Sequence, residues 1–218
     1  MDSRFDRRTR GVLVGGAILK EIELSQVDVR PRFARMPDTP QGSGRSLTIL
    51  YAKEPDVFQR ELTLYKFNLN YLRLLAADLD EADMGAAPFP GANPPVWILG
   101  HLAVATDYAG RMLGLETTCP RRWHVQFAPG SKPCDVQEPY PSKAELVAAI
   151  ENGHRRVAEA AANATDEAMN QPHSVELLKP TVLKTTGDVL AHLMCTHAAF
   201  HTAQLSACRR KAGKASII

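Results

Sequence analysis

Apolar side chains recur at helical spacing in four separate stretches of the 218-residue chain. In the first stretch, from Pro55 to Asp80, they follow one another three or four positions apart. This spacing predicts a helix with one face against a core. Asn68 lies in a widened part of this stripe, where it is either a polar residue at the core edge or a neighbour of a functional site. The stripe consists of Phe58, Leu62, Tyr65, Leu69, Leu72 and Ala76, widened by Leu64, Tyr71 and Leu75.

The second helical stretch is marked by residues that start and stop helices. Asn93 is a residue type that caps helices, and Pro94 suits the first helical position. The predicted helix then runs to about Leu113, and Gly114 ends it.

The third helix is predicted to begin at a capping box formed by Ser142 and Glu145, and to run to about Ala162. His154 lies within this helix, and we expect it at the surface or at the edge of the core. The apolar stripe comprises Leu146, Ala149, Ile150, Val157 and Ala161.

The last and longest helical pattern extends from Thr185 to Gly213, and no proline interrupts it. Thr185 and Asp188 form a variant of the capping box at its start. Three consecutive cations near its end, residues 209–211, suit the negative end of the helix dipole. Gly213 then stands where a glycine commonly ends a helix.

Four helices of roughly twenty residues, joined partly by long connections, predict an all-α fold, an up-down four-helix bundle over residues 51–218. The connection 115–141 is rich in proline and aromatic residues. We expect it to pack over one end of the bundle and to form part of a pocket wall. Residues 170–184 form the last connection.

Residues 1–50 are predicted to be an irregular or disordered N-terminal extension, because glycine and proline interrupt each apolar run. A short strand around 11–24 is the one element expected there. A start codon assigned too far upstream is an alternative explanation for this segment, and a transit peptide is disfavoured by its four early acidic residues.

Composition and charge narrow the choice of function. The chain is 44% hydrophobic but has no run of eighteen apolar residues, which predicts a cytoplasmic protein without a membrane span. Residues 1–46 hold nine Lys and Arg against six acidic residues, which leaves 17 basic and 18 acidic residues in the remainder. The bundle is therefore not expected to bind nucleic acid through charge.

Four cysteines without a signal peptide indicate free thiols in a reducing compartment. A pair between Cys119 and Cys134 in the long connection is the alternative. Cys208 lies about 10 Å along the last helix from His201, too far to share a metal ion with it.

Two histidines in the last helix, His197 and His201, are four residues apart and therefore lie on one face. This spacing lets two imidazoles reach one metal ion. The same face carries Leu190, Met194 and Leu205, so it points inward, and Gln204 lies on it as a neighbour of the pair. A partly buried pair without metal is the alternative. By its spacing, His192 is expected off this face.

His101, in the middle of the second helix, is the natural third ligand. Trp97 and Tyr108 share its face and are candidate pocket residues. Three imidazoles leave one position of a tetrahedral ion open, as in catalytic sites. His124 in the long connection remains an alternative fourth ligand.

Two motifs carry a resemblance to a known family. The sequence Asn93-Pro-Pro-Val-Trp-Ile-Leu-Gly-His101-Leu is followed by Thr196-His197-Ala-Ala-Phe-His201-Thr-Ala-Gln204-Leu. Together they resemble the DinB-like (YfiT-type) metal-binding four-helix bundle family, over about residues 54–213. The resemblance implies a metal triad of His101, His197 and His201. Ala203 departs from the glycine that commonly precedes the motif glutamine, but no ligand is affected.

The three histidines predict one divalent metal ion per chain; imidazole suits zinc, nickel, copper and iron alike, and we expect zinc or nickel. The family resemblance also implies a homodimer. Members include enzymes that use a low-molecular-weight thiol. The metalloprotease motif HExxH is absent, because Ala198, Ala199 and Phe200 separate the two histidines. A metal held by three neutral imidazoles keeps its full charge and can activate either water or a thiol.

From these features we expect a metal-dependent enzyme acting on a small molecule, with a thiol-dependent transferase favoured. A hydrolase that uses activated water is the first alternative. A non-enzymatic metal-binding stress-response protein, in which the ion mainly holds the helices together, is the second.

Overall fold

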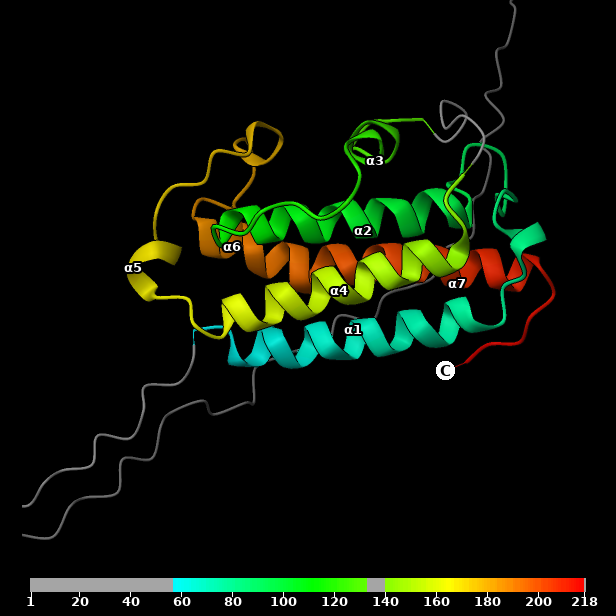
Figure 1. Ribbon diagram of the computed structural model, residues 1–218, viewed down its shortest axis with the longest axis horizontal. Coiled ribbons are helices and arrows are strands. Elements are labelled where there is room, and N and C mark those ends of the chain that lie inside the picture. Colours follow the sequence, from blue (N-terminus) through cyan, green and yellow to red (C-terminus); the bar gives the residue numbers. More distant parts are fainter. Residues whose placement is uncertain (1–56, 133–139, 218) are drawn as a thin grey trace, which may run out of the picture. The chain divides into compact units, whose positions relative to one another are not determined.

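The structure, a computed structural model, describes residues 57–132 and 140–217. It confirms an all-α four-helix bundle, and the described residues contain no β-strand. The predictions for residues 1–50 lie outside the described residues. Three of the four long helical elements are single helices, and the fourth is continuous from α6 through η4 to α7 (Figure 1). The long elements are α1 (Gln59–Ala77), α2 (Pro95–Met112), α4 (Lys143–Ala161), α6 (Thr186–Ala191), η4 (His192–His197) and α7 (Ala198–Lys211).

Within the described residues, four short helical turns lie in the connections. The connection between α2 and α4, expected to be irregular, contains one of them over Trp123 and its neighbours. One isolated bridge, between Pro172 and Thr185, closes the connection that precedes α6. The short elements are η1 (Glu81–Asp83), α3 (Arg121–Gln126), α5 (Asp166–Met169) and η3 (Glu176–Leu178).

Most of the predicted helix ends are confirmed. Ser142 and Thr185 both form capping boxes, in which each side chain accepts a hydrogen bond from the third residue of its helix. Gly114 and Gly213 adopt φ angles of 77° and 79°, a conformation that favours glycine. Asn93 was wrongly predicted as a cap. Pro94 holds that position with extended backbone, and Pro95 begins α2.

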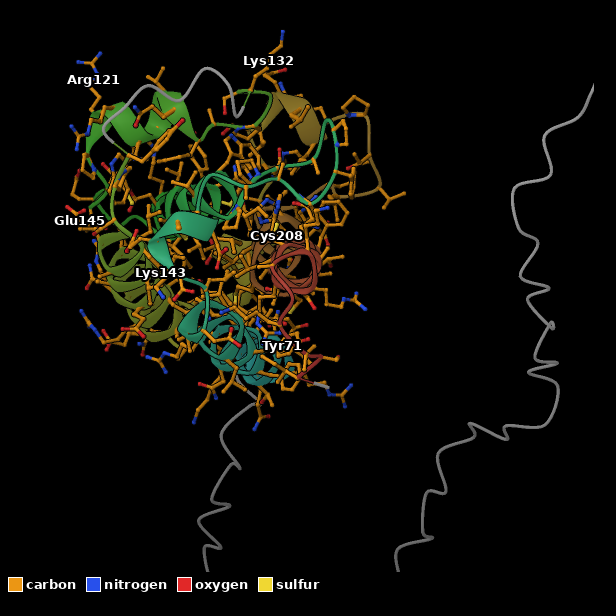
Figure 2. The ribbon with its side chains drawn as sticks, turned by 90° about the vertical axis from the view of Figure 1, so that its right-hand side faces the viewer. Tyr71, Arg121, Lys132, Lys143, Glu145 and Cys208 are labelled. Atoms are coloured by element: carbon orange, nitrogen blue, oxygen red, sulfur yellow. The ribbon has the colours of Figure 1, made fainter. Side chains whose placement is uncertain are left out.

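Two pairs of neighbouring helices run antiparallel. His154 of α4 stacks on Tyr65 near the start of α1, whereas Lys143 at the start of α4 reaches the carbonyl of Ala76 at the end of α1, 3.1 Å away. Figure 2 views the bundle from the end at which Lys143 lies. Helix α2 and the last helix are also antiparallel, because His101 meets His197 while the thiol of Cys208 contacts the carbonyl that precedes α2.

The other two pairs run parallel. Asn68 of α1 bonds to η4, and Asp78 just after α1 pairs with Arg209 of α7. Thr106 of α2 lies against Gly153 of α4, so closely that a Cβ at Gly153 would lie 1.9 Å from the Thr106 hydroxyl. The chain therefore runs up, down, down and up. The connection from α2 to α4 must return along the whole of α2, whose 18 residues span about 27 Å, and it carries α3 over the outer side of α2 (Figure 1).

The return of this connection places α2 at the centre of the fold. Its residues from Pro95 to Gly110 are all buried except Tyr108, which is half-buried.

Arg209, near the end of α7, is also buried. It makes two hydrogen bonds to Asp78, of 2.7 and 2.6 Å, which lower the pKa of that carboxyl group. Within the described residues, no helix is long and apolar enough to cross a membrane.

Helix α1 leaves three large apolar side chains exposed. We therefore keep the prediction that the protein forms a homodimer. Leu64, Phe67 and Leu74 are 52, 57 and 56% exposed. We expect the protein to have twice its chain mass of 23.9 kDa in solution, and Phe67→Glu to return it to the mass of one chain, since a buried charge opposes association. Light scattering measures both. Val182→Glu, at a site that is 89% exposed in another segment, is the control. A wild-type mass of one chain would contradict the prediction.

Candidate metal centre

Three histidines meet in the middle of the bundle. His101 comes from α2, His197 ends η4, and His201 lies in the first turns of α7. One ring nitrogen of each lies within 4.8 Å of the others, and the Nε2 atoms of His101 and His197 are 3.0 Å apart. His101 and His201 are 5 and 7% exposed. The antiparallel packing of α2 against the last helix therefore brings together the three residues that the sequence predicted.

The turn that carries His197 is a π-helix, η4, which has more residues per turn than an α-helix. It corrects the prediction for His192. In a regular α-helix His192 would point away from His197, but the wider turn brings residues five apart onto one face. The ring centroids of His192 and His197 are 5.9 Å apart. The sequence gives no clear signal for a π turn, because the apolar spacing around it suits an α-helix equally well.

Asn68 supports the π turn rather than the histidine side chains. Its amide donates to the carbonyls of Met194 and Cys195, at 3.2 and 3.1 Å. These are backbone oxygens of η4, so α1 holds the turn that aims His197. Asn68 is thus a polar residue at the core edge whose influence on the site is indirect.

We expect Asn68→Ala to lower the free energy of unfolding by about 1–3 kcal/mol, because two partly buried carbonyls lose their donor. Urea unfolding measures this loss. Metal affinity should also fall, since His197 loses its fixed position, and a titration with zinc measures it. Asn70→Ala, at an exposed site on the same helix, is the control. Equal stability of the two variants would refute a role of Asn68 in holding the turn.

Two of the histidines have an acceptor that orients the ring. The Nδ1 of His101 lies 2.7 Å from the carbonyl of Phe127, and the Nδ1 of His201 lies 3.0 Å from the Oε1 of Gln204. Because each acceptor requires a proton on Nδ1, the Nε2 lone pair of both rings is free for a metal. The Nδ1 of His197 is buried and has no hydrogen-bond partner within the described part of the chain.

Trp97 covers His101 on one side. The two rings are stacked, with centroids 4.7 Å apart and planes 8° apart. The indole nitrogen donates to the Ser131 hydroxyl at 3.0 Å, and Ser131 donates to the carbonyl of Gln126 at 2.9 Å. The connection between α2 and α4 thus holds both His101 and its neighbour Trp97. The sequence could not indicate Phe127 as a partner, because its contribution is a backbone carbonyl.

The centre favours uncharged imidazoles. Burial lowers the pKa of His101, and burial together with the neighbouring histidines lowers the pKa of His197 to about 3 and that of His201 to about 4. Neutral imidazole is the form that binds a metal. The three neutral rings have converging nitrogens, and two of them have a fixed tautomer. This arrangement fits a divalent ion held by nitrogen ligands.

Two histidines in other parts of the bundle do not join the cluster. His124 donates to the buried carboxylate of Asp107 at 3.0 Å and lies outside the group of converging ring nitrogens, so the structure does not place it as a fourth ligand. His154 was expected at the surface or at the edge of the core, but it is buried. It is 7% exposed, stacks on Tyr65 with centroids 3.3 Å apart, and hydrogen-bonds to the Tyr65 carbonyl. Burial lowers the pKa of His154 to about 4, so the ring stays neutral in the core.

The cysteine thiols of the described residues lie away from the centre. Cys119 and Cys208 are buried, and Cys195 contacts the carbonyl of Glu61. Burial raises the pKa of Cys119 to about 12 and that of Cys208 to about 11, so both remain thiols. Cys119 is a free cysteine, while Cys134 lies outside the described residues.

A cleft of about 690 Å³ opens beside the centre. Its walls come from α2, from η4 and from residues 174–178 of the connection before α6. His192, His197 and the predicted pocket residue Tyr108 all line it. The connection 115–141 was expected to form part of a pocket wall, and its residue Pro129 lines this cleft. A small molecule in the cleft can therefore reach the histidine cluster directly.

Comparison with known proteins supports the same fold. YfiT from Bacillus subtilis, described as a probable metal-dependent hydrolase with an unusual four-helix bundle topology, has a solved structure that matches with a TM-score of 0.55 and 13% sequence identity. The match covers 80% of this chain and 95% of that one, and at this identity it is evidence for the fold. None of the curated proteins matches this chain significantly in sequence.

The sequence itself matches a family profile over residues 64–205, the larger part of the chain. The matched region begins within α1 and ends in α7, so it includes all four long helical elements and the three histidines. The chain therefore belongs to the DinB superfamily.

Proposed function

We propose that this protein is a metal-dependent enzyme that hydrolyses a small molecule held in the cleft beside His197. The observation that carries the proposal is the convergence of three neutral imidazole rings within 4.8 Å at the edge of that cleft. His101, His197 and His201 would hold the ion; imidazole suits zinc, nickel, copper and iron alike, and zinc or nickel is the ion that we expect.

When bound, a divalent ion at this centre supplies a Lewis acid that activates water. The residues of the chain do the rest. The carbonyl of Phe127 and the amide of Gln204 keep the Nε2 atoms of His101 and His201 unprotonated. Trp97 stacks on His101 and excludes solvent from that side. His192 and Tyr108 face the cleft and offer hydrogen bonds to a substrate.

Hydrolysis is favoured because it requires no additional cosubstrate. The YfiT structure, which shares this fold, is described as that of a probable metal-dependent hydrolase. A protease of the HExxH type is disfavoured, because Ala198, Ala199 and Phe200 separate the two histidines and no glutamate stands between them to act as general base.

A thiol-dependent transferase is the second candidate. The thiols of Cys119, Cys195 and Cys208 are buried or turned to other contacts, so no cysteine of the described residues supplies the reacting thiolate, and a small molecule would bring it. A cleft of about 690 Å³ is large enough to admit such a cosubstrate next to His197.

The test compares metal-loaded protein on a panel of activated esters and alkyl halides, with and without glutathione or cysteine. Hydrolysis without thiol that chelation abolishes would support the hydrolase. Products that contain the thiol, formed only when it is added, would support the transferase. Stoichiometric metal without turnover in either assay would favour the non-enzymatic alternative, and His197→Ala controls for contaminating enzymes.

A further inference from the structure

We propose that the cleft binds an anionic amphiphile, with its carboxylate or phosphate head at Arg111 and its apolar chain directed toward His197. The inference rests on the proposed function for the reaction that follows, but the binding itself requires no metal. It names the class of ligand that the cleft would take, and a substrate of this class would carry its hydrolysable bond at the end opposite the anionic head, next to His197.

The shape and lining of the cleft suit an apolar chain. Its volume of about 690 Å³ lies within the roughly 300–1,000 Å³ of small-molecule sites. Apolar side chains from four segments form most of the wall, and burying an aliphatic chain against them is favourable. They include Met112, Pro129, Leu177, Leu178, Val189 and Leu193.

The charge in the cleft selects the head group. Among the described residues that line the cleft, Arg111 is the one with a fixed charge, and none is an aspartate or a glutamate. Arg111 is exposed, and its guanidinium group makes no hydrogen bond or ion pair with another described residue. A guanidinium group binds carboxylate and phosphate through paired hydrogen bonds, so an anion is favoured and a cation is repelled.

The distance between the two ends of the site sets the length of the ligand. His101 and Arg111 are ten residues apart on α2, which corresponds to about 15 Å along the helix axis. A ligand that reaches from Arg111 to the histidine cluster therefore needs a chain on the order of ten carbon atoms.

Leu177 is an apolar side chain of the cleft wall that a bound apolar chain would contact. It is 69% exposed at the wall of the cleft, where an apolar chain would cover it. Val182 lies in the same connection and is 89% exposed, but it does not line the cleft. The two residues therefore form a matched pair for substitution.

The experiment is calorimetric titration of metal-free and zinc-loaded protein with four probes that share a ten-carbon chain: decanoate, decyl phosphate, decanol and decyltrimethylammonium. We expect both anions to bind metal-free protein at least about tenfold more tightly than decanol, and the cation not to bind. Arg111→Gln should weaken both anions about tenfold and leave decanol unchanged. Arg121→Gln removes an outward-pointing cation on α3 and should have no effect (Figure 2). Leu177→Ser should weaken every probe that binds, whereas Val182→Ser should not.

Two results would overturn the proposal. In the first, the charge of Arg111 makes no difference: decanol binds as tightly as decanoate, or Arg111→Gln leaves the affinity for both anions unchanged. In the second, the anions bind only zinc-loaded protein, which would place the head at the histidine cluster instead of Arg111. If decanoate binds where decyl phosphate does not, the head is a carboxylate, and the reverse assigns a phosphate. Failure of the proposed function would appear separately, as absent turnover with probe binding to metal-free protein intact.

Discussion

His101→Ala, His197→Ala and His201→Ala are each expected to lower the affinity for zinc or nickel by more than about 100-fold, because loss of even a supporting contact costs 10–100-fold. Each variant leaves two nitrogens where the wild type presents three within 4.8 Å. Competition with a chromophoric chelator measures the affinity. Elemental analysis of protein purified without a histidine tag measures the metal content, and we expect one ion per chain in the wild type.

Two other histidines supply the controls for this experiment. His192→Ala removes an imidazole that faces the cleft and contacts His197, and His154→Ala removes one buried against Tyr65. Neither belongs to the cluster, so both variants should retain the metal. Circular dichroism checks that each variant is folded. Wild-type affinity in His101→Ala, or no stoichiometric metal in the reconstituted wild type, would refute the centre.

Gly100→Ala is expected to damage both stability and metal binding although it touches no ligand. A Cβ at Gly100 would lie 2.5 Å from the ring of Phe127, whose carbonyl holds the Nδ1 of His101. Overpacking of this kind costs about 1–3 kcal/mol of the free energy of unfolding. Displacement of the carbonyl removes the acceptor that orients His101, which should weaken metal binding about 10–100-fold. Urea unfolding and the chelator competition measure the two effects.

Gly110→Ala on the same helix is the matched control. A Cβ there would meet Leu115 at 3.5 Å, an ordinary contact, and alanine favours a helix over glycine by about 1 kcal/mol. We therefore expect this variant to be as stable as the wild type or more so, with unchanged metal affinity. If Gly100→Ala had the same stability and metal affinity as Gly110→Ala, the close contact between Phe127 and Gly100 would not be needed to hold His101.

The contact between Phe127 and His101 follows from the direction of the helices. Because α2 and α4 are parallel neighbours, the chain between them has to travel back along α2, and the residue that passes His101 contributes its carbonyl. The same segment brings Ser131 to Trp97. A bundle with alternating helix directions would join these helices by a short loop and would leave His101 without this support.

Local features of the sequence by themselves determined the helices and most of the metal centre. Capping boxes at Ser142 and Thr185 and glycines at 114 and 213 act within one turn of the chain, so the sequence identifies them without knowledge of the fold. The spacing of His197 and His201 is likewise a local property. The GHL motif and the family resemblance added His101, and the structure places the three rings together.

Only the tertiary structure decided the features that depend on other segments. The π turn that turns His192 toward the cleft is held by an amide from α1, Asn68, more than a hundred residues away. His154 is buried because α4 packs against Tyr65, although its own neighbours in sequence would suit a surface position. The acceptor for His101 is a backbone carbonyl, which every residue possesses and no sequence pattern distinguishes. Apolar periodicity shows which face of a helix is buried, but the direction of each helix and its partners are set by how all the helices pack together.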